Sequence, residues 1–524
     1  MKKVVIAILV IMMTLSLAVG CAKDESNGKT LPHQHETDEG LSAETKAKDT
    51  KIPRRYTASK GLEFESNDDG TCNITGLGSF EENILVIPNE SSSGEKVIYI
   101  EKDAFWGMDD VESVVFSDNY LTVGSGAFSY SRLESVVVIG GEITIDKDAF
   151  NACDDLEEIE ISNCDIELGN NAFVGGGDST SIKLSESKVK IGDSTFSYFD
   201  CSSLQIVNCE LIIGESAFSS CSKLATIEIE NCIFETDERL FWGSGKATDL
   251  KISNSTGKLG ENFFSYGACN NIVIENCDLS IGDYGLSACE KLESLIFEDS
   301  LLHIEDEAFW GSGKNLNVSF VNCSGNLNDK VFSYGAAETI AVDNSKLKIG
   351  DYAFTSCEKL TNLEIKDSEL LFGDEVFWNA GYSSNVVVEG SDVQLGRSAF
   401  NYASIESISI EGKKLVVEKE SFSSIEDLSS LVIDCEMVEM GKHCFYNCEE
   451  LENVTIGASL HAEDGEIILN NEAFWYCSNL SEAFINGHSV TIGSDCFYSN
   501  AKDLIITVNG QTYSANNISE GLSF

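Results

Sequence analysis

Cysteine offers the broadest chemistry in this sequence, because a thiol serves as a nucleophile, a metal ligand or a disulfide partner. The chain has 18 cysteines, and many recur at fixed places. Cys153, Cys221, Cys289 and Cys357 follow one another at intervals of 68 residues, a regularity that favours a packing role. In an oxidising compartment three pairs are candidates for disulfides. These pairs are Cys209 with Cys232, Cys201 with Cys221, and Cys269 with Cys289.

Signals for catalysis or for a metal centre are missing from the sequence. None of the 6 histidines belongs to a recognisable motif, and there is no C-x2-C spacing, G-x-S-x-G or phosphate-binding loop. With 87 acidic residues in the chain, the choice of any two carboxylates as an acid–base pair is arbitrary. The sequence therefore predicts a protein that is not an enzyme, with no cofactor and no metal site.

Aromatic residues carry a more specific signal. Four tryptophans directly follow a phenylalanine, and a tyrosine stands 24 residues after each of them, so the two rings should meet along one edge. Trp and Tyr combine large faces with a polar group, and we predict that this edge binds an extended ligand, a glycan or a protein segment. The alternative is that the rings only pack on each other and seal the edge. The residues are Trp106, Tyr130, Trp242, Tyr266, Trp310, Tyr334, Trp378 and Tyr402.

An internal repeat sets the positions of these residues. A phenylalanine, once replaced by leucine, recurs at steps of 22 or 23 residues, with one step of 29, and three steps form a cassette of 68 residues. A fixed period in this range predicts a solenoid. The series is Phe105, Phe128, Phe150, Phe173, Phe196, Phe218, Phe241, Phe264, Leu286, Phe309, Phe332, Phe354, Phe377, Phe400, Phe422, Phe445, Phe474 and Phe497.

Two short alternating segments flank the core ring in each repeat. Around Phe150, Ile143 and Ile145 alternate with polar residues before the ring, and Ile159 and Ile161 do so after it. Alternation predicts short strands with one buried face, and the segment between the ring and the following strand is too short for a helix. We expect a mostly β solenoid of about 18 coils, with terminal caps and a central spine of stacked rings.

The repeats resemble the BspA-like class of bacterial leucine-rich repeat surface proteins. The pattern is carried by segments such as "IGESAFSSCSKLATIEI", "IGDYAFTSCEKLTNLEI" and "IDKDAFNACDDLEEIEI". The resemblance extends over roughly residues 60 to 510. It implies a leucine-rich repeat solenoid displayed at the cell surface, and for some members binding to host matrix proteins or to other cells. It implies no catalytic residues.

The charge of the chain limits its partners. With 35 basic and 87 acidic residues the net charge is -52, and the excess is spread along the whole repeat array. Such a surface is soluble, repels nucleic acid and resists self-association. We therefore predict a monomer that does not bind nucleic acid.

The N-terminal segment predicts export. Residues 1–20, "MKKVVIAILVIMMTLSLAVG", place two lysines before an apolar run, as in a secretory signal peptide. The sequence "LAVGC" that ends at Cys21 resembles a bacterial lipobox, which implies cleavage before Cys21 and a lipid on its sulfur. The polar residues 21–57 predict a flexible tether, because they bury too little apolar surface to offset the entropy of ordering.

The rest of the chain divides into three parts. Residues 58–104 are irregular and are expected to cap the first core layer, residues 105–497 form the solenoid, and residues 498–524 form the C-terminal cap. The repeat between Phe445 and Phe474 is longer than its neighbours, which predicts an extra loop around residues 461–466.

These observations predict a non-catalytic surface protein, anchored in the bacterial membrane through a lipid at Cys21. Its long face or edge would bind a host or bacterial surface protein or glycan, for adhesion or for ligand capture. The alternative is a purely structural acidic spacer or surface-coat component without a specific ligand.

Overall fold

The computed structural model describes residues 56–457, 459, 465–515 and 519–524. The predicted signal peptide, Cys21, residues 21–55 of the predicted tether, and residues 461–464 of the predicted extra loop lie outside the described residues. Residues Tyr56–Phe524 form one compact unit that contains every strand and the whole of the described core.

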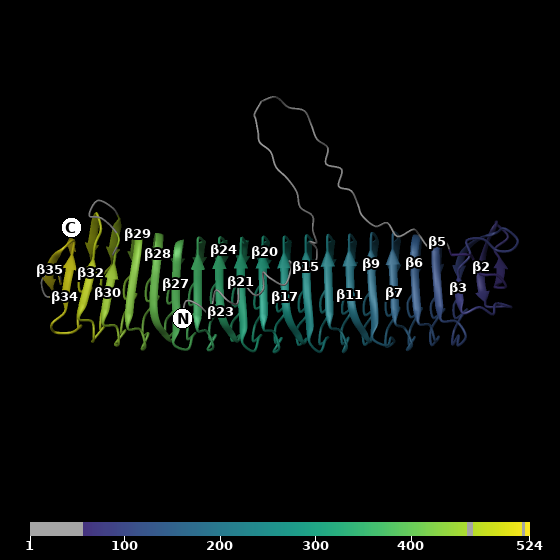
Figure 1. Cartoon of the computed structure of the whole chain (residues 1–524), viewed down its shortest axis with the longest axis horizontal. Helices are drawn as coiled ribbons and strands as arrows, with labels where there is room; N and C mark the ends of the chain where they lie inside the picture. The colour runs from purple at the N-terminus through teal and green to yellow at the C-terminus, as the bar shows by residue number, and fades with distance from the viewer. Residues whose placement is uncertain (1–55, 458, 460–464, 516–518) are drawn as a thin grey trace, which may run out of the picture. The chain divides into compact units, whose positions relative to one another are not determined.

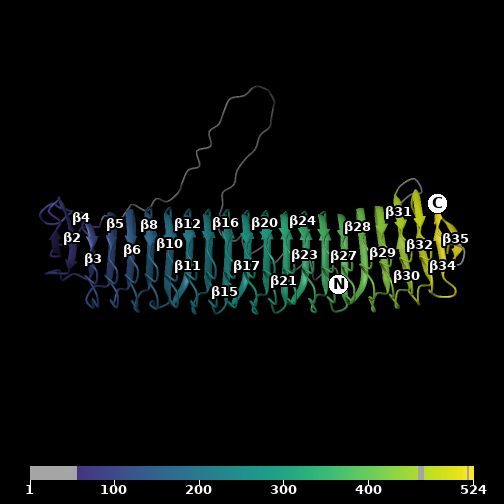
Figure 2. The ribbon, with the colours of Figure 1, turned by 180° about the vertical axis from the view of Figure 1, so that it is seen from behind.

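The described residues form 36 strands and no α-helix, and the strands follow in chain order along the unit (Figures 1 and 2). Parallel pairing between successive coils builds two sheets. Five long strands bend around the corner and belong to both sheets. These five are β5 (Ser113–Val123), β6 (Ser135–Ile145), β27 (Ser384–Leu395), β28 (Ile405–Val417) and β29 (Ser430–Met440).

The other parallel strands belong to one sheet each. The first sheet holds β3 (Ile84–Val86), β7 (Glu158–Ser162), β9 (Thr180–Ser185), β11 (Cys201–Val207), β13 (Thr226–Glu230), β15 (Thr248–Ser253), β17 (Cys269–Glu275), β19 (Ser294–Glu298), β21 (Leu316–Val321), β23 (Ala337–Asp343), β25 (Asn362–Lys366), β30 (Asn453–Ile456), β32 (Glu482–Ile485) and β34 (Ile505–Val508). The second sheet holds β2 (Thr71–Gly76), β4 (Lys96–Ile100), β8 (Asp165–Leu168), β10 (Lys188–Ile191), β12 (Glu210–Ile213), β14 (Ile233–Thr236), β16 (Thr256–Leu259), β18 (Asp278–Ile281), β20 (Leu301–Ile304), β22 (Ser324–Leu327), β24 (Lys346–Ile349), β26 (Glu369–Phe372), β31 (Glu466–Leu469) and β33 (Ser489–Ile492).

One coil therefore consists of a turn and two strands. After the turn of Phe218 the chain forms β13, bends at Asn231, forms β14 and enters the next turn. β13 pairs in parallel with β11 and β15, and β14 pairs with β12 and β16. This arrangement confirms the predicted leucine-rich repeat solenoid with two short strands per repeat.

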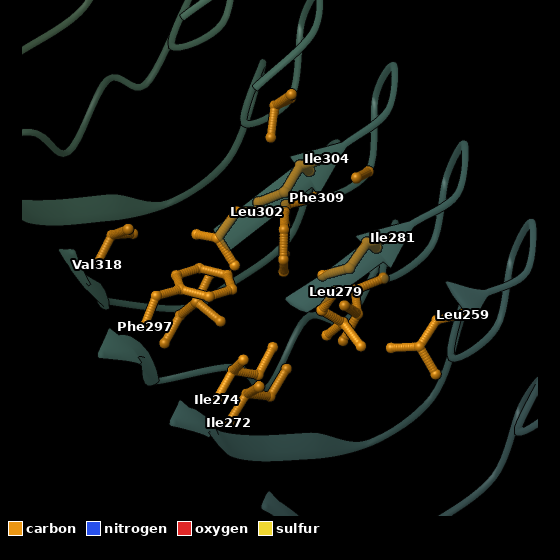
Figure 3. Close-up of a cluster of buried hydrophobic side chains, with 14 of the residues drawn as sticks. Leu259, Ile272, Ile274, Leu279, Ile281, Phe297, Leu302, Ile304, Phe309 and Val318 are labelled. Atoms are coloured by element: carbon orange, nitrogen blue, oxygen red, sulfur yellow. The ribbon is translucent and has the colours of Figure 1, made fainter. Parts of the chain in front are cut away.

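The core ring of each turn lies against the ring of the next turn. Consecutive phenylalanines from Phe105 to Phe264 and from Phe309 to Phe497 have ring centroids 4.6 to 5.5 Å apart, so the predicted spine is confirmed. Figure 3 shows apolar side chains of both sheets gathered around one such ring, Phe309. All of these rings are buried, which places the largest apolar surface of each coil in one continuous core.

The corner between the two strands of a coil requires a left-handed backbone. Asn231, Asn276 and Asn322 occupy it with φ of 54°, 52° and 54°, a region that Asn tolerates better than other residues with a side chain. The corner side chains also bond to each other across coils. Nδ2 of Asn322 donates to Asp299 (2.9 Å), and Nδ2 of Asn344 donates to Oδ1 of Asn322 (2.7 Å).

The ends of the unit carry packing that the repeat does not describe. Tyr56 packs on the outer face of the first sheet against Val86, Val115 and Val137. At the other end β34 lies inside the predicted cap but still pairs in parallel with β32. Three strands then close the ends in antiparallel pairs: β1 (Glu63–Ser66) on β2, β35 (Gln511–Ser514) on β34, and β36 (Leu522–Ser523) on β33.

The cysteines pack in the core. All 17 described cysteines are buried free thiols, including the three candidate disulfide pairs. Cys153, Cys221, Cys289 and Cys357 make the same contact: each thiol donates to the carbonyl of the core Phe of the preceding coil, with Sγ to O distances of 3.2 Å. Burial raises the pKa of the Cys153 thiol to about 11 and that of Cys357 to about 12, so both remain protonated and unreactive at neutral pH.

Candidate ligand-binding edge

The predicted aromatic residues lie on the turns, directly beyond the core spine. We call the two turn positions that follow each core Phe the edge positions, and the side chains on them the aromatic edge. Backbone bonds hold the edge positions of successive coils in register: the N–H of Tyr266 donates to the carbonyl of Ser287, and the N–H of Ala288 donates to that of Trp310 (3.1 and 2.9 Å). The spacing of the edge side chains is therefore the spacing of the coils.

The structure brings each predicted Trp into contact with its predicted Tyr. The ring centroids lie 5.8 Å apart in the pair Trp106–Tyr130, and the rings are tilted against each other. The pairs Trp242–Tyr266, Trp310–Tyr334 and Trp378–Tyr402 follow with centroid distances of 6.2, 6.1 and 6.3 Å and edge-on rings. The same geometry thus repeats in every cassette that carries both residues.

These rings remain accessible although they touch. Trp106, Trp242 and Trp310 are 59%, 41% and 40% exposed, and Trp378 is half-buried. The four paired tyrosines are more exposed than Trp242 and Trp310, with Tyr266 at 66%. Each Trp is thus partly covered and partly open to solvent, and its Tyr partner is largely open.

The tyrosines occupy an unfavourable backbone conformation. Tyr130, Tyr266, Tyr334 and Tyr402 have φ between 57° and 59°, where a residue with a bulky side chain is rare. Gly243 and other glycines fill the same edge position in neighbouring coils without this penalty, which is about 1–2 kcal/mol. Ala152, Ser220 and Ala288 hold the same position with φ of 54° to 58°, so the left-handed conformation belongs to the turn of the repeat.

The aromatic edge is larger than the sequence prediction. Tyr198 occupies the same edge position without a Trp partner, and further rings continue the edge over the last coils: Tyr446, Trp475, Tyr476 and Tyr498. Trp475 contacts all three tyrosines, with centroid distances of 5.9 Å to Tyr446, 5.3 Å to Tyr476 and 6.2 Å to Tyr498. The same rule of position, one or two residues after the core Phe, would have identified each of them.

Charges beside the edge are compensated locally. Lys330 Nζ lies 3.2 Å from Glu307 Oε1, and Arg239 Nη1 lies 2.8 Å from Glu215 Oε1. The charge of Glu375, partial burial and a hydrogen bond from the hydroxyl raise the pKa of Tyr352, so this phenol stays neutral and remains a donor. The edge therefore offers neutral aromatic faces, some of which lie beside ion pairs.

The described residues contain no group of three or more His, Cys, Asp or Glu side chains with the geometry to hold a metal ion. Within the same residues, no helix is long and apolar enough to span a bilayer.

Comparison with known proteins identifies the repeat. The family described as BspA type leucine rich repeat region (6 copies) matches residues 85–205, 189–317, 279–400, 325–452 and 393–518. A search of curated proteins finds no match. Among solved structures, a leucine-rich repeat protein from Bacteroides ovatus ATCC 8483 is 19% identical, with 82% of this chain and 94% of that one covered and a TM-score of 0.34. A leucine rich cell surface protein from Faecalibacterium prausnitzii A2-165 is 18% identical, with 83% and 96% covered and a TM-score of 0.29.

Proposed function

This chain belongs to the BspA-type leucine-rich repeat family, and we propose that it is a lipid-anchored, non-catalytic surface protein whose aromatic edge binds an extended macromolecule. Adhesion to host or neighbouring cells and ligand capture both fit such a protein. The observation that carries the proposal is the row of accessible Trp–Tyr pairs, which recur along one edge at multiples of the 68-residue cassette.

Several weak contacts along the aromatic edge can together bind one long ligand tightly. Aromatic residues with a polar group supply much of the energy at binding sites, and each accessible pair offers one such contact. A ligand that reaches several pairs binds the second and later pairs intramolecularly, so its overall affinity exceeds that for one pair. An extended glycan or protein segment meets this condition, whereas a small molecule does not.

The proposed location also rests on the sequence. The net charge of -52 suits a soluble extracytoplasmic surface, and the solved neighbour from Faecalibacterium prausnitzii is described as a cell surface protein. In the proposal Cys21 carries the lipid and residues 22–55 connect it to the solenoid. Replacement of Cys21 by Ser should then abolish incorporation of radiolabelled palmitate in the native host, and unchanged labelling would refute the anchor.

The binding test replaces edge residues by those that this chain uses at equivalent positions. Residues 56–524 contain the whole described core and its caps, so they serve as the soluble array. The variant carries Trp242→Ser, Trp310→Ser and Trp378→Ser, since serine fills this edge position in other coils, for example Ser265 and Ser333. Tyr120→Ser removes a ring that is 56% exposed on β5, away from the turns, and is the matched control.

Binding to immobilised host matrix proteins and glycans is measured at low and at physiological salt. The proposal expects saturable binding at physiological salt that is lost in the triple variant and retained in Tyr120→Ser. Binding only at low salt would indicate attraction to the acidic surface, because salt screens such attraction. Equal binding by the triple variant and the control would refute the aromatic edge, and the absence of any ligand would favour an acidic spacer.

A further inference from the structure

The gaps between successive aromatic pairs are not equivalent. After Tyr198, Tyr266 and Tyr334, one coil with small residues at both edge positions separates the tyrosine from the next Trp, such as Ser219 and Ser220 between Tyr198 and Trp242. In the gap between Tyr198 and Trp242, this coil carries Ser216 two residues before its core residue, Phe218. The next two gaps carry Tyr284 and Tyr352 at the equivalent place.

A shallow depression with a volume of ≈ 530 Å³ lies beside Ser216. Tyr198 and Trp242 both line it, and Ser216, Ser220, Asn171 and Arg239 contribute polar side chains to the lining. We call this depression the Tyr198–Trp242 notch. A tyrosine at position 216, as at Tyr284, would occupy the same space.

The polar groups of the notch suit a ligand rich in hydroxyls. The hydroxyls of Ser216 and Ser220 have no hydrogen-bond partner among the described residues, so both can donate and accept. The guanidinium of Arg239 already pairs with Glu215 and Glu238, so it adds donors without a net positive charge. The net negative charge of the protein repels an anionic ligand, so a neutral ligand is favoured.

The backbone around the notch argues against a peptide. The N–H of Tyr198 donates to the carbonyl of Ser219, and the N–H of Ser220 donates to that of Trp242, both at 2.9 Å. An extended peptide gains affinity from a free strand edge, and these turns do not provide one. Side-chain hydroxyls and the rings of Tyr198 and Trp242 remain as the binding groups.

We propose that the Tyr198–Trp242 notch binds one pyranose unit of a neutral glycan. The inference rests on the proposed function and names the ligand class of its aromatic edge. The sugar ring lies against the rings of Tyr198 and Trp242, and its hydroxyls bond to Ser216, Ser220 and Arg239. The neighbouring Trp–Tyr pairs then contact further units of the same chain.

The test fills the notch and opens a second one. Ser216→Tyr inserts the residue that this protein carries at Tyr284 and Tyr352, and the backbone already suits it, with φ of 57° at Ser216 and 55° at Tyr284. Tyr284→Ser makes the gap between Tyr266 and Trp310 like the notch. Ser398→Tyr adds a tyrosine at an equivalent position in a distant coil and serves as the control.

Residues 56–524 are titrated with cellotetraose, chitotetraose, mannotetraose and galactotetraose by isothermal calorimetry. We expect at least one tetrasaccharide to bind at one site, to bind at least about tenfold more weakly to Ser216→Tyr, which is about 1.4 kcal/mol, and to bind unchanged to Ser398→Tyr. Tyr284→Ser should raise the number of sites to two. Absence of binding by all four sugars, or full binding by Ser216→Tyr, overturns the notch. A protein ligand that binds the edge despite Ser216→Tyr overturns the notch but leaves the proposed function intact.

Discussion

Truncation of one ring in the core spine should destabilise the whole array. Phe332 is buried, and its ring stacks between those of Phe309 and Phe354, with centroid distances of 4.8 and 4.9 Å and nearly parallel planes. Phe332→Ala removes both contacts and leaves a cavity that parallel strands on either side cannot close. A Phe→Ala change in a core costs about 3–5 kcal/mol.

Phe332→Leu supplies the internal comparison. Leu286 occupies the equivalent position in another coil, next to Phe264 and Phe309, so the turn accepts a leucine. The cost should fall to about 1.5 kcal/mol or less, the range of a conservative change of core shape. Trp310→Ser, which alters a ring on the surface of the same turn as Phe309, should cost less than Phe332→Ala.

The assay is urea unfolding of residues 56–524, followed by circular dichroism, together with amide hydrogen exchange of the coils around residue 332. Exchange is required because repeat arrays can unfold in stages, and then a single free energy of unfolding is not defined. We expect Phe332→Ala to lower the urea midpoint and to accelerate exchange most strongly in the coils of Phe309, Phe332 and Phe354. A loss below about 1 kcal/mol, or equal losses for Ala and Leu, would refute the view that stacked rings hold neighbouring coils together.

Two further predictions concern the thiols and the corners. Burial raises the pKa of Cys289 and Cys357 to about 12, so the folded state holds these protons more tightly than the unfolded state. Their contribution to stability is complete below the ordinary thiol pKa of about 8.5 and is lost as pH rises toward 12, so the melting temperature should fall between pH 8 and pH 10.5. Iodoacetamide should leave these thiols unmodified at pH 8 until urea is added, as counted by mass spectrometry, and rapid modification of the folded protein would contradict their burial. Asn322→Ala should cost about 2 kcal/mol, because alanine tolerates φ of 54° poorly and the bonds to Asp299 and Asn344 are lost. Asn322→Gly, which relieves the backbone, should recover part of this loss in the same urea titration, and equal stability of Ala and wild type would contradict the role of the corner.

The regular part of the fold could be predicted because each coil repeats the same sequence pattern. The interval between phenylalanines placed the spine, and the alternation at Ile159 and Ile161 placed β7. The same interval brought Trp242 and Tyr266 together, since residues at equivalent positions of parallel coils must be neighbours.

Deviations from the repeat could not be predicted in this way. Phe263 is buried beside Phe264 because the following coil carries Gly285 and Leu286, and a side chain at Gly285 would meet Ile281 and Phe263. The Tyr198–Trp242 notch likewise depends on the small side chain of Ser216, where the equivalent residue of another coil is Tyr284. Such features arise where two adjacent coils both depart from the repeat and their side chains fit each other. The repeat pattern describes only what the coils share, so it does not predict them.

Packing across the repeat also escaped the sequence pattern. Tyr56 covers Val86, Val115 and Val137, although residues around it read as a polar tether. A single aromatic residue in a polar segment gives no sign of the sheet face on which it lies, and only the three-dimensional arrangement joins it to valines that are 30 to 81 residues away.

The reversed strands at the two ends determine how long this structure can become. A parallel coil ends on a row of unpaired backbone groups that another coil of the same polarity could continue, and nothing within the coil itself stops such growth. β1, β35 and β36 run in the opposite direction, so an incoming solenoid end meets strands whose polarity does not continue its own. At the C-terminal end β35 and β36 thus close both sheets to parallel extension, and at the N-terminal end β1 closes the second sheet.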